Sequence, residues 1–265
     1  LSAEGGHALA RAMMTTDTRP KETAVTFQVD GRQVHLGGVT KGSGMIHPNM
    51  ATMLAFVTTD VAVERRFLQS TLKEAADASF NMLTVDGDTS TNDTLLVLAN
   101  GLAGNRPIGA GSPEAAAFKE ALFQVCVALT RQMARDGEGA SRIIVVEVDG
   151  AGNTADARKA ARTIASSSLV KSAVYGADPN WGRVVAALGR SGAAVDENRI
   201  DLFVNGVCIM EGGKPIPFHR DAVVALMRGP EVTFRLQLNL GDGQATAWGC
   251  DLTEQYVIIN SAYTT

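Results

Sequence analysis

A turn rich in glycine and proline leads into an apolar stretch at residues 41–54, KGSGMIHPNMATML. Within it, Pro48 fixes its own φ, Asn49 can bend the backbone through its side chain, and small Ala51 precedes Thr52. A crowded turn of this kind is what strained self-cleavage of a peptide bond needs. Attack of the Thr52 hydroxyl on the Ala51 carbonyl would convert the amide into an ester. Hydrolysis of that ester would leave Thr52 as a new N-terminal residue.

The exposed Thr52 would carry its own base. A threonine hydroxyl is a weak nucleophile that needs activation. The α-amine freed by cleavage would lie beside it with an unperturbed pKa of about 7.7–8, which suits a general base near neutral pH. Such an N-terminal nucleophile would require no His–Asp pair. On spacing alone, however, Thr52 as the ordinary first residue of a strand is favoured over this nucleophile.

Other polar motifs give weaker indications of a catalytic or binding site. Residues 40–44, TKGSG, lack the spacing of a nucleotide-binding P-loop. Residues 86–93 are dense in acidic and hydroxyl groups but lack EF-hand spacing, which favours a hydrogen-bonded turn over a cation loop. The four histidines show no paired metal spacing, so we expect no metal and no cofactor. At residues 178–181, DPNW, Asp178 is expected to cap a helix with Pro179 in its first position.

Composition indicates a compact protein without nucleic-acid or membrane partners. The net charge of -4, with a sequence pI of about 5.6, leaves no basic excess for phosphates. No apolar run approaches the roughly 20 residues of a membrane span. The three cysteines are far apart, which fits buried thiols in a reducing compartment. The start of the sequence has no initiator Met and no signal-peptide layout.

Hydrophobic periodicity predicts strands and helices that interleave along the chain, which favours an α/β protein. Half-buried strands are expected at residues 24–29, 32–36 and 232–238, with a hairpin at Asp30-Gly31. Strands covered on both faces are expected at residues 54–57, 95–99, 143–148 and 200–204. Helices are expected at residues 61–82, 113–135, 155–166, 179–188, 218–227 and 252–263, and a loop at residues 100–113.

Seven motifs in order resemble the bifunctional ornithine acetyltransferase (glutamate N-acetyltransferase) family. Besides residues 41–54, they are MTTDT at 14–18, VDGDTSTNDT at 85–94, GEGA at 137–140, DPNWGR at 178–183, AWGCDL at 247–252 and NSAYTT at 260–265. The likeness extends over essentially the whole chain. It implies a layered α-β-β-α fold with mixed sheets flanked by helices, related to the aminopeptidase and ornithine acetyltransferase fold.

The resemblance also implies residue roles. Thr52 matches the nucleophile, and the cut is expected between Ala51 and Thr52. The expected substrate contacts are Thr15, Lys41, Thr52, Glu138, Asn260 and Thr265. Lys41 could pair a substrate carboxylate and Glu138 could attract the ammonium of ornithine. Structural roles remain open for two of them, Glu138 as a turn or cap residue and Asn260 as a helix-end residue.

Residues 1–51 would then be the end of an α portion and residues 52–265 a β portion that begins at the nucleophile. The family's oxyanion donors, a Thr-Gly pair, are expected in an α segment N-terminal to residue 1. Loss of such a donor typically slows an enzyme a hundred- to a thousandfold. The resemblance further implies a heterotetramer of two α and two β chains, in the cytoplasm or, in a eukaryote, an organelle matrix.

The implied function is ping-pong transfer of an acetyl group from N-acetylornithine to glutamate through an acetyl-Thr52 ester, in arginine biosynthesis. Acetyl-CoA is a further acetyl donor in some members of the family. Two alternatives stay open. A self-cleaving aminopeptidase of the same fold would pass the acyl group to water, although its nucleophile is normally serine. An inactive fragment or interaction module would lack the oxyanion segment altogether.

Overall fold

The computed structural model describes residues 4–47, 53–89 and 92–262, which form two compact units. Unit 1 comprises Leu1–Asn81 and Asp88–Met133, and unit 2 comprises Met82–Gly87 and Ala134–Thr265. The expected boundary between residues 51 and 52 is a different kind of division. It concerns a peptide bond to be cut rather than the edge of a compact unit, and it stays a prediction.

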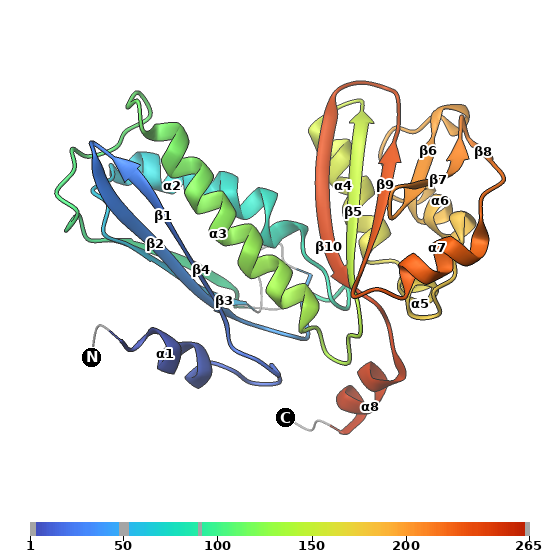
Figure 1. Ribbon diagram of the computed structural model, residues 1–265, viewed down its shortest axis with the longest axis horizontal. Coiled ribbons are helices and arrows are strands. Elements are labelled where there is room, and N and C mark those ends of the chain that lie inside the picture. The colour runs from blue at the N-terminus through green and yellow to red at the C-terminus, as the bar shows by residue number, and fades with distance from the viewer. Residues whose placement is uncertain (1–3, 48–52, 90–91, 263–265) are drawn as a thin grey trace. The chain divides into compact units, whose positions relative to one another are not determined.

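Unit 1 is built on a four-stranded sheet in the order β1-β2-β3-β4 (Figure 1). The strands are β1 (Lys21–Val29), β2 (Arg32–Lys41), β3 (Leu54–Thr59) and β4 (Thr94–Ala99). Antiparallel pairing joins β1 to β2 and β2 to β3, whereas β3 and β4 are parallel. The sheet therefore pairs a strand that precedes the proposed cut, β2, with the strand that follows it, β3.

The Asp30-Gly31 hairpin is confirmed, because both residues have positive φ, 49° and 70°. Such angles suit a two-residue turn between twisted strands. The second strand continues five residues beyond its predicted end, to Lys41. Gly37 and Gly38 interrupt the apolar alternation there. A Cβ at Gly38 would lie 3.0 Å from side-chain atoms of Val125 and Leu129, so the glycine lets a helix approach the sheet closely.

The described residues of unit 1 include the helices α1 (Gly6–Ala12), α2 (Arg65–Ala78) and, up to Met133, α3 (Ala115–Arg135). A short turn η1 (Phe80–Met82) follows α2. The Phe118 ring of α3 lies 6.4 Å from Phe27 of β1 and 6.0 Å from Phe67 of α2, centroid to centroid. These contacts join α3 to α2 and to the sheet. Figure 1 shows both helices alongside the sheet. Helix α1 contacts β1 and β2.

Strand β4 corrects one expectation. Residues 95–99 were expected to be covered on both faces, but β4 ends the sheet order, and Leu96 and Leu98 are 42% and 55% exposed. A continuous apolar run shows only that a strand tolerates burial on both sides. It does not show which neighbours lie there.

Unit 2 is built on a six-stranded sheet in the order β10-β5-β9-β6-β7-β8. Its strands are β5 (Ile143–Ala151), β6 (Asp201–Val204), β7 (Val207–Glu211), β8 (Lys214–Pro215), β9 (Glu231–Gln237) and β10 (Gly243–Cys250). Of these strands, β5 and β9 pair in parallel, and the other neighbouring pairs are antiparallel. The sheet is thus mixed, as expected, and β5 is almost completely buried.

The helices of unit 2 are α4 (Thr154–Ala165), α5 (Ser168–Tyr175), α6 (Trp181–Gly189), α7 (Arg220–Met227) and α8 (Glu254–Ala262), with a short turn η2 (Glu197–Arg199). Helix α4 packs on β5 and β10 through a row of buried alanines. Both units therefore consist of sheets flanked by helices, and the predicted mixed α/β class is confirmed.

The start of α6 differs from the expected one. Asn180, not Asp178, caps the helix, since its side chain accepts a hydrogen bond from the Arg183 N–H at 3.2 Å. Asp178 instead accepts a hydrogen bond from the guanidinium of Arg220 at 3.0 Å. The cap is therefore shifted by two residues, because another helix supplies a partner for Asp178 that local sequence cannot show.

Over the described ranges, no helix combines the length and the apolar character needed to cross a membrane.

Candidate active site

Residues 48–52, including Ala51 and Thr52, lie outside the described residues, as does Thr265. The chain on both sides of residues 48–52 is bonded to the segment just before β4. The carbonyl of His47 accepts a hydrogen bond from the Thr89 hydroxyl at 2.9 Å. On the other side, the Met53 N–H donates to the Asp93 carboxylate, and the Met53 carbonyl accepts from the Thr94 N–H at 2.8 Å.

Two motifs far apart in the sequence therefore meet in unit 1, the one at residues 41–54 and the one at residues 85–94. The second was expected to be a hydrogen-bonded turn, and its described part does make hydrogen bonds, including those to the other motif. Parallel pairing of β3 with β4 explains the meeting, because it aligns Leu54 with Thr94 and so sets the residues before both strands side by side.

Asp93 has an unusual electrostatic environment. It is half-buried, and this burial raises the pKa of its carboxyl group to about 6. The Met53 N–H and the positive charge of Lys41 lower that pKa, but they do not offset the burial. Near neutral pH, Asp93 is thus mostly ionised. The hydrogen bond and the nearby charge do not fully compensate this carboxylate for the hydration that burial removes.

Lys41 and Thr15, two of the expected substrate contacts, lie together. Lys41 is the last residue of β2 and pairs in register with Leu54 of β3. Its ammonium nitrogen lies 3.5 Å from the Thr15 hydroxyl oxygen. Lys41 is half-buried and Thr15 is exposed. The pairing of β2 with β3 thus places a lysine beside the strand that Thr52 precedes in sequence.

Asp17 holds the loop that carries Thr15. Its carboxylate accepts hydrogen bonds from the Gly42 N–H at 2.7 Å and the Thr15 N–H at 3.1 Å, and it pairs with Lys21 at 2.5 Å. Burial alone would raise the pKa of Asp17, but these donors outweigh it and leave the pKa lowered. The ionised carboxylate therefore ties this loop to the end of β2.

Glu138 and Asn260, the expected contacts in unit 2, also lie together although 122 residues separate them. The Asn260 amide donates to the Glu138 carboxylate at 2.8 Å and to the Tyr256 carbonyl at 3.0 Å. Glu138 lies in a turn closed by a 2.8 Å hydrogen bond from the Ala140 N–H to the Gly137 carbonyl. Both residues thus have structural contacts, which leaves their substrate-binding roles as predictions.

The turn that carries Glu138 is fixed against the start of α8. The Thr253 hydroxyl donates to the Gly139 carbonyl at 2.7 Å. Gly139 has a φ of 71°, and a Cβ there would lie 2.6 Å from the backbone nitrogen of Tyr256. Only glycine fits at this position. Close contact between turn and helix is what aligns Glu138 with Asn260.

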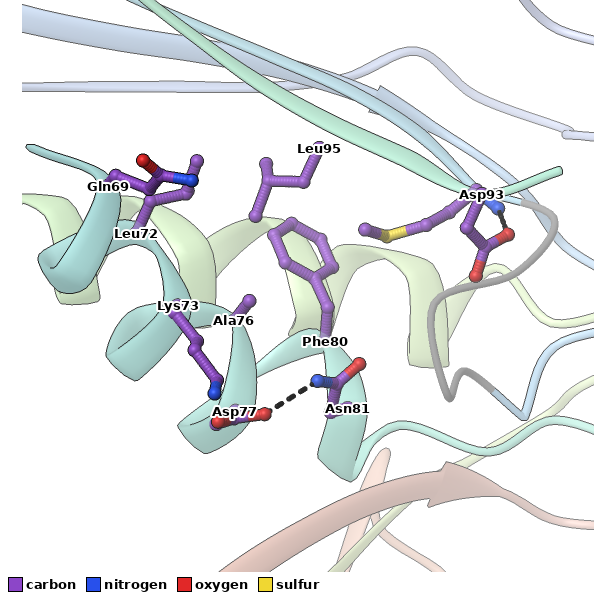
Figure 2. Close-up of a pocket in the computed structure, with 10 residues that line it drawn as sticks. Gln69, Leu72, Lys73, Ala76, Asp77, Phe80, Asn81, Asp93 and Leu95 are labelled. Atoms are coloured by element: carbon purple, nitrogen blue, oxygen red, sulfur yellow. Dashed lines mark hydrogen bonds between the residues drawn. The ribbon is translucent and has the colours of Figure 1, made fainter. Parts of the chain in front are cut away.

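A pocket of about 470 Å³ lies between α2, the turn η1 and the start of β4. Figure 2 shows Asp93 near one end of it, with Phe80 and Leu95 further along and the polar groups of α2 on the opposite side. Met53 also lines the pocket. Its position next to residue 52 makes it part of the candidate site.

Asp17 and Asp93 carry no signal in the sequence that separates them from surface carboxylates. Their importance comes from burial and long-range pairing, which single-sequence patterns do not contain. Among the described residues, no three His, Cys, Asp or Glu side chains gather as metal ligands.

A family model described as the ArgJ family matches residues 1–265. The chain belongs to the ArgJ family. This confirms the family that the seven motifs predict. The arginine biosynthesis bifunctional proteins ArgJ of Symbiobacterium thermophilum and Dehalococcoides mccartyi are 55% and 53% identical to the chain over all 265 of its residues. The chain spans 66% and 65% of the length of these ArgJ proteins, just under two thirds.

The ArgJ fold is shown by a solved structure as well. The crystal structure of arginine biosynthesis bifunctional protein ArgJ from Bacillus halodurans is 44% identical in sequence and superposes with a TM-score of 0.79. The match covers 80% of this chain and 100% of the other. This agreement confirms the fold class that the resemblance implies.

Proposed function

We propose that this ArgJ-family protein is an acetyltransferase of arginine biosynthesis, with Thr52 as nucleophile after cleavage of the Ala51-Thr52 bond. The observation that supports the proposal most strongly is the family match over the whole chain. The geometry of unit 1 agrees with it, because Lys41, Thr15 and Asp93 all lie near the residues that flank position 52 in sequence.

The proposed cycle has two half-reactions. The Thr52 hydroxyl oxygen attacks the acetyl carbonyl of N-acetylornithine while the Thr52 α-amine takes the hydroxyl proton. Collapse of the tetrahedral intermediate returns that proton to the leaving nitrogen, which releases ornithine and leaves an acetyl ester on Thr52. The amine of glutamate then attacks the ester, N-acetylglutamate leaves, and the Thr52 hydroxyl is restored.

The charges of the expected substrate contacts, each considered within its own unit, suit these substrates. N-acetylornithine and glutamate both carry carboxylates that the Lys41 ammonium can bind. Glu138 can bind the side-chain ammonium of ornithine, for which Asn260 already orients one of its carboxylate oxygens. Acetyl-CoA is proposed as a further acetyl donor rather than as a bound cofactor. Assembly into a heterotetramer of two α and two β chains, and a cytoplasmic location, complete the proposal.

Transfer to glutamate distinguishes this function from hydrolysis by a related aminopeptidase. The full-length protein should convert N-acetylornithine and glutamate into ornithine and N-acetylglutamate in equal amounts. Thr52→Ala should abolish both cleavage and transfer, whereas Thr52→Ser keeps a hydroxyl and should retain part of both. Release of free acetate without acetylated glutamate would contradict the transferase. Transfer retained in Thr52→Ala would contradict the nucleophile.

A further inference from the structure

The carboxylate of Asp251, which directly follows β10, is buried and bonded on both oxygens. Oδ1 accepts hydrogen bonds from the backbone N–H groups of Ser141 at 2.8 Å and Arg142 at 3.0 Å. Oδ2 accepts one from the Ser141 hydroxyl and lies 3.8 Å from Nη1 of Arg142. Both partner residues lie between the turn at residues 137–140 and β5. One carboxylate thus ties the chain that leaves this turn to the end of β10.

The side chain of Asp251 does more than continue the pairing of two strands. The Asp251 N–H already extends the pairing of β10 with β5 by donating to the Arg142 carbonyl at 3.1 Å. That bond needs no carboxylate. Removing a carboxylate from water costs free energy, which hydrogen-bond donors and a nearby cation must offset. The donors that do so here belong to the residues after the turn, so the side chain fixes the conformation of this segment.

Arg142 extends the network from Asp251 to two helices. Its guanidinium donates to the carbonyls of Val174 at 3.4 Å and Tyr175 at 3.1 Å, at the C-terminal end of α5. A cation is favoured at this end of a helix. The Tyr175 hydroxyl donates to the Glu254 carboxylate at 2.6 Å, in the first turn of α8. Contacts therefore lead from Asp251 through Arg142 and α5 to the start of α8.

The two expected substrate contacts of unit 2 lie on the elements that this network joins. Glu138 lies in the turn at residues 137–140, and Asn260 lies on α8 and donates to it at 2.8 Å. The Thr253 hydroxyl holds the turn from the side of α8 by donating to the Gly139 carbonyl at 2.7 Å. Asp251 holds the chain that leaves the turn on the side of β5. The position of Glu138 therefore depends on both attachments.

We propose that Asp251 is a positioning residue for substrate recognition, holding the turn so that the Glu138 carboxylate can bind the side-chain ammonium of N-acetylornithine. This inference rests on the proposed function, because it requires Glu138 to be that contact. Asp251 acts through the backbone of Ser141 and Arg142. Preference for a cationic acetyl donor over an apolar one thus depends on the motif at residues 247–252, which the family resemblance leaves without a role.

A comparison of two acetyl donors separates the positioning of Glu138 from a general loss of folded protein. N-acetylnorvaline has the carbon chain of N-acetylornithine but lacks the terminal amine. A carboxylate that binds this amine makes the protein prefer N-acetylornithine, which is measured as the ratio of the two kcat/KM values. Unfolded or uncleaved protein lowers both kcat/KM values equally and leaves their ratio unchanged. The ratio therefore responds to the position of Glu138 and not to stability.

Two substitutions of Asp251 are compared in the full-length protein, with Tm measured for each. Asp251→Ala removes the side-chain bonds, whereas Asp251→Asn keeps an oxygen for the two backbone N–H groups. Asp201→Ala is the matched control, because Asp201 also accepts from a backbone N–H, that of Gly212 at 2.8 Å. Asp201 belongs to β6, which β5 and β9 separate from β10. Glu138→Gln gives the ratio that remains once the carboxylate itself is lost.

We expect Asp251→Ala to lower the preference for N-acetylornithine about tenfold, mainly through a higher KM for this donor. Asp251→Asn should lower it about threefold, and Asp201→Ala should keep the wild-type ratio. Glu138→Gln should lose the preference as well. Adding Asp251→Ala to Glu138→Gln should cause no further loss of preference, since both changes remove the same contact.

The wild-type ratio in Asp251→Ala would overturn the inference. If Asp251→Ala does not fold, the wild-type ratio in Asp251→Asn overturns it instead. An unchanged ratio in Glu138→Gln would do the same, because Glu138 would then not bind the amine. The failure of the proposed function looks different, since the wild-type protein would then transfer no acetyl group from N-acetylornithine to glutamate.

Discussion

At the scale of single residues, two aspartates of unit 1 show how surroundings decide a carboxylate's behaviour. Both are removed from water, but Asp17 receives backbone donors and a lysine and has a lowered pKa, whereas Asp93 has a pKa of about 6. The difference lies in the partners and not in the residue type. Asp17 is suited to hold a loop, whereas burial disfavours the ionised form of Asp93.

The cost of burying the Asp93 charge can be measured in a Thr52→Ala background, in which no cleavage is expected. Because the folded-state pKa of Asp93, about 6, exceeds its unfolded value of 3.8, the ionised carboxylate destabilises the folded state at pH 7. Asp93→Asn should therefore raise Tm by about 2–4 °C at pH 7.

This gain in Tm should shrink as pH falls below 6 and vanish near pH 4, since folded Asp93 then takes up a proton before the unfolded chain does. Thermal unfolding of Thr52→Ala, with and without Asp93→Asn, at several pH values measures this difference in Tm. A gain in Tm that is the same at pH 4 and pH 7 would show that the charge of Asp93 is not its origin.

Lys41 should contribute mainly to substrate binding. Lys41→Met keeps the apolar stem but removes the charge that would pair a substrate carboxylate. We expect KM for N-acetylornithine and glutamate to rise about tenfold to a hundredfold, which corresponds to loss of one hydrogen bond to a charged group. Lys119→Met is the control, because Lys119 pairs with Glu74 on the surface. Steady-state kinetics with unchanged KM in Lys41→Met would refute its role.

At the scale of elements, patterns in the sequence predict strands and long helices but not their partners. The Asp30-Gly31 hairpin and the helix near residues 113–135 follow from local rules and are confirmed. Strand β10, GQATAWGC, is absent from the prediction because its small residues give little alternation. Helix α5, SLVKSAVY, is absent too, since eight residues are too short for a clear helical period.

The candidate site shows the same limit. Residues 41–54 suggest a nucleophile through local turn chemistry, and the family resemblance supplies the expected contacts. The pairing of Glu138 with Asn260 and of Met53 with Asp93 depends on sheet and helix packing across 122 and 40 residues. No periodicity within one segment contains that information.

The contact between α8 and the turn at residues 137–140 offers a test at this scale. Gly139→Ala adds a Cβ that would clash with the Tyr256 backbone nitrogen, at a residue with positive φ. The turn and α8 must then separate, which should disturb the Glu138–Asn260 hydrogen bond and raise KM for N-acetylornithine several-fold or more. Tm should fall as well, by an amount typical of about 1–3 kcal/mol of strain.

Gly192→Ala is the matched control for this change. Gly192 also has a positive φ, 72°, but a Cβ there meets no atom within 4 Å. It should lose some stability and keep its KM. Equal effects of the two substitutions on KM would show that contact with α8 does not position Glu138.

At the scale of the whole molecule, the proposed cut falls between two strands of one sheet. Strand β2 precedes it, β3 follows it, and their register runs from Leu36↔Thr59 to Lys41↔Leu54. Hydrogen bonds of the sheet therefore join the two portions without the peptide bond between residues 51 and 52. After cleavage the portions should copurify under native conditions and separate only in denaturant.

Intact mass of the full-length protein, before and after brief exposure to N-acetylornithine, tests the central claim most directly. We expect two fragments split between Ala51 and Thr52, and the fragment that begins with Thr52 should gain one acetyl group that added glutamate removes. A chain that stays uncleaved, or a Thr52 fragment that never gains the acetyl group, would contradict the account.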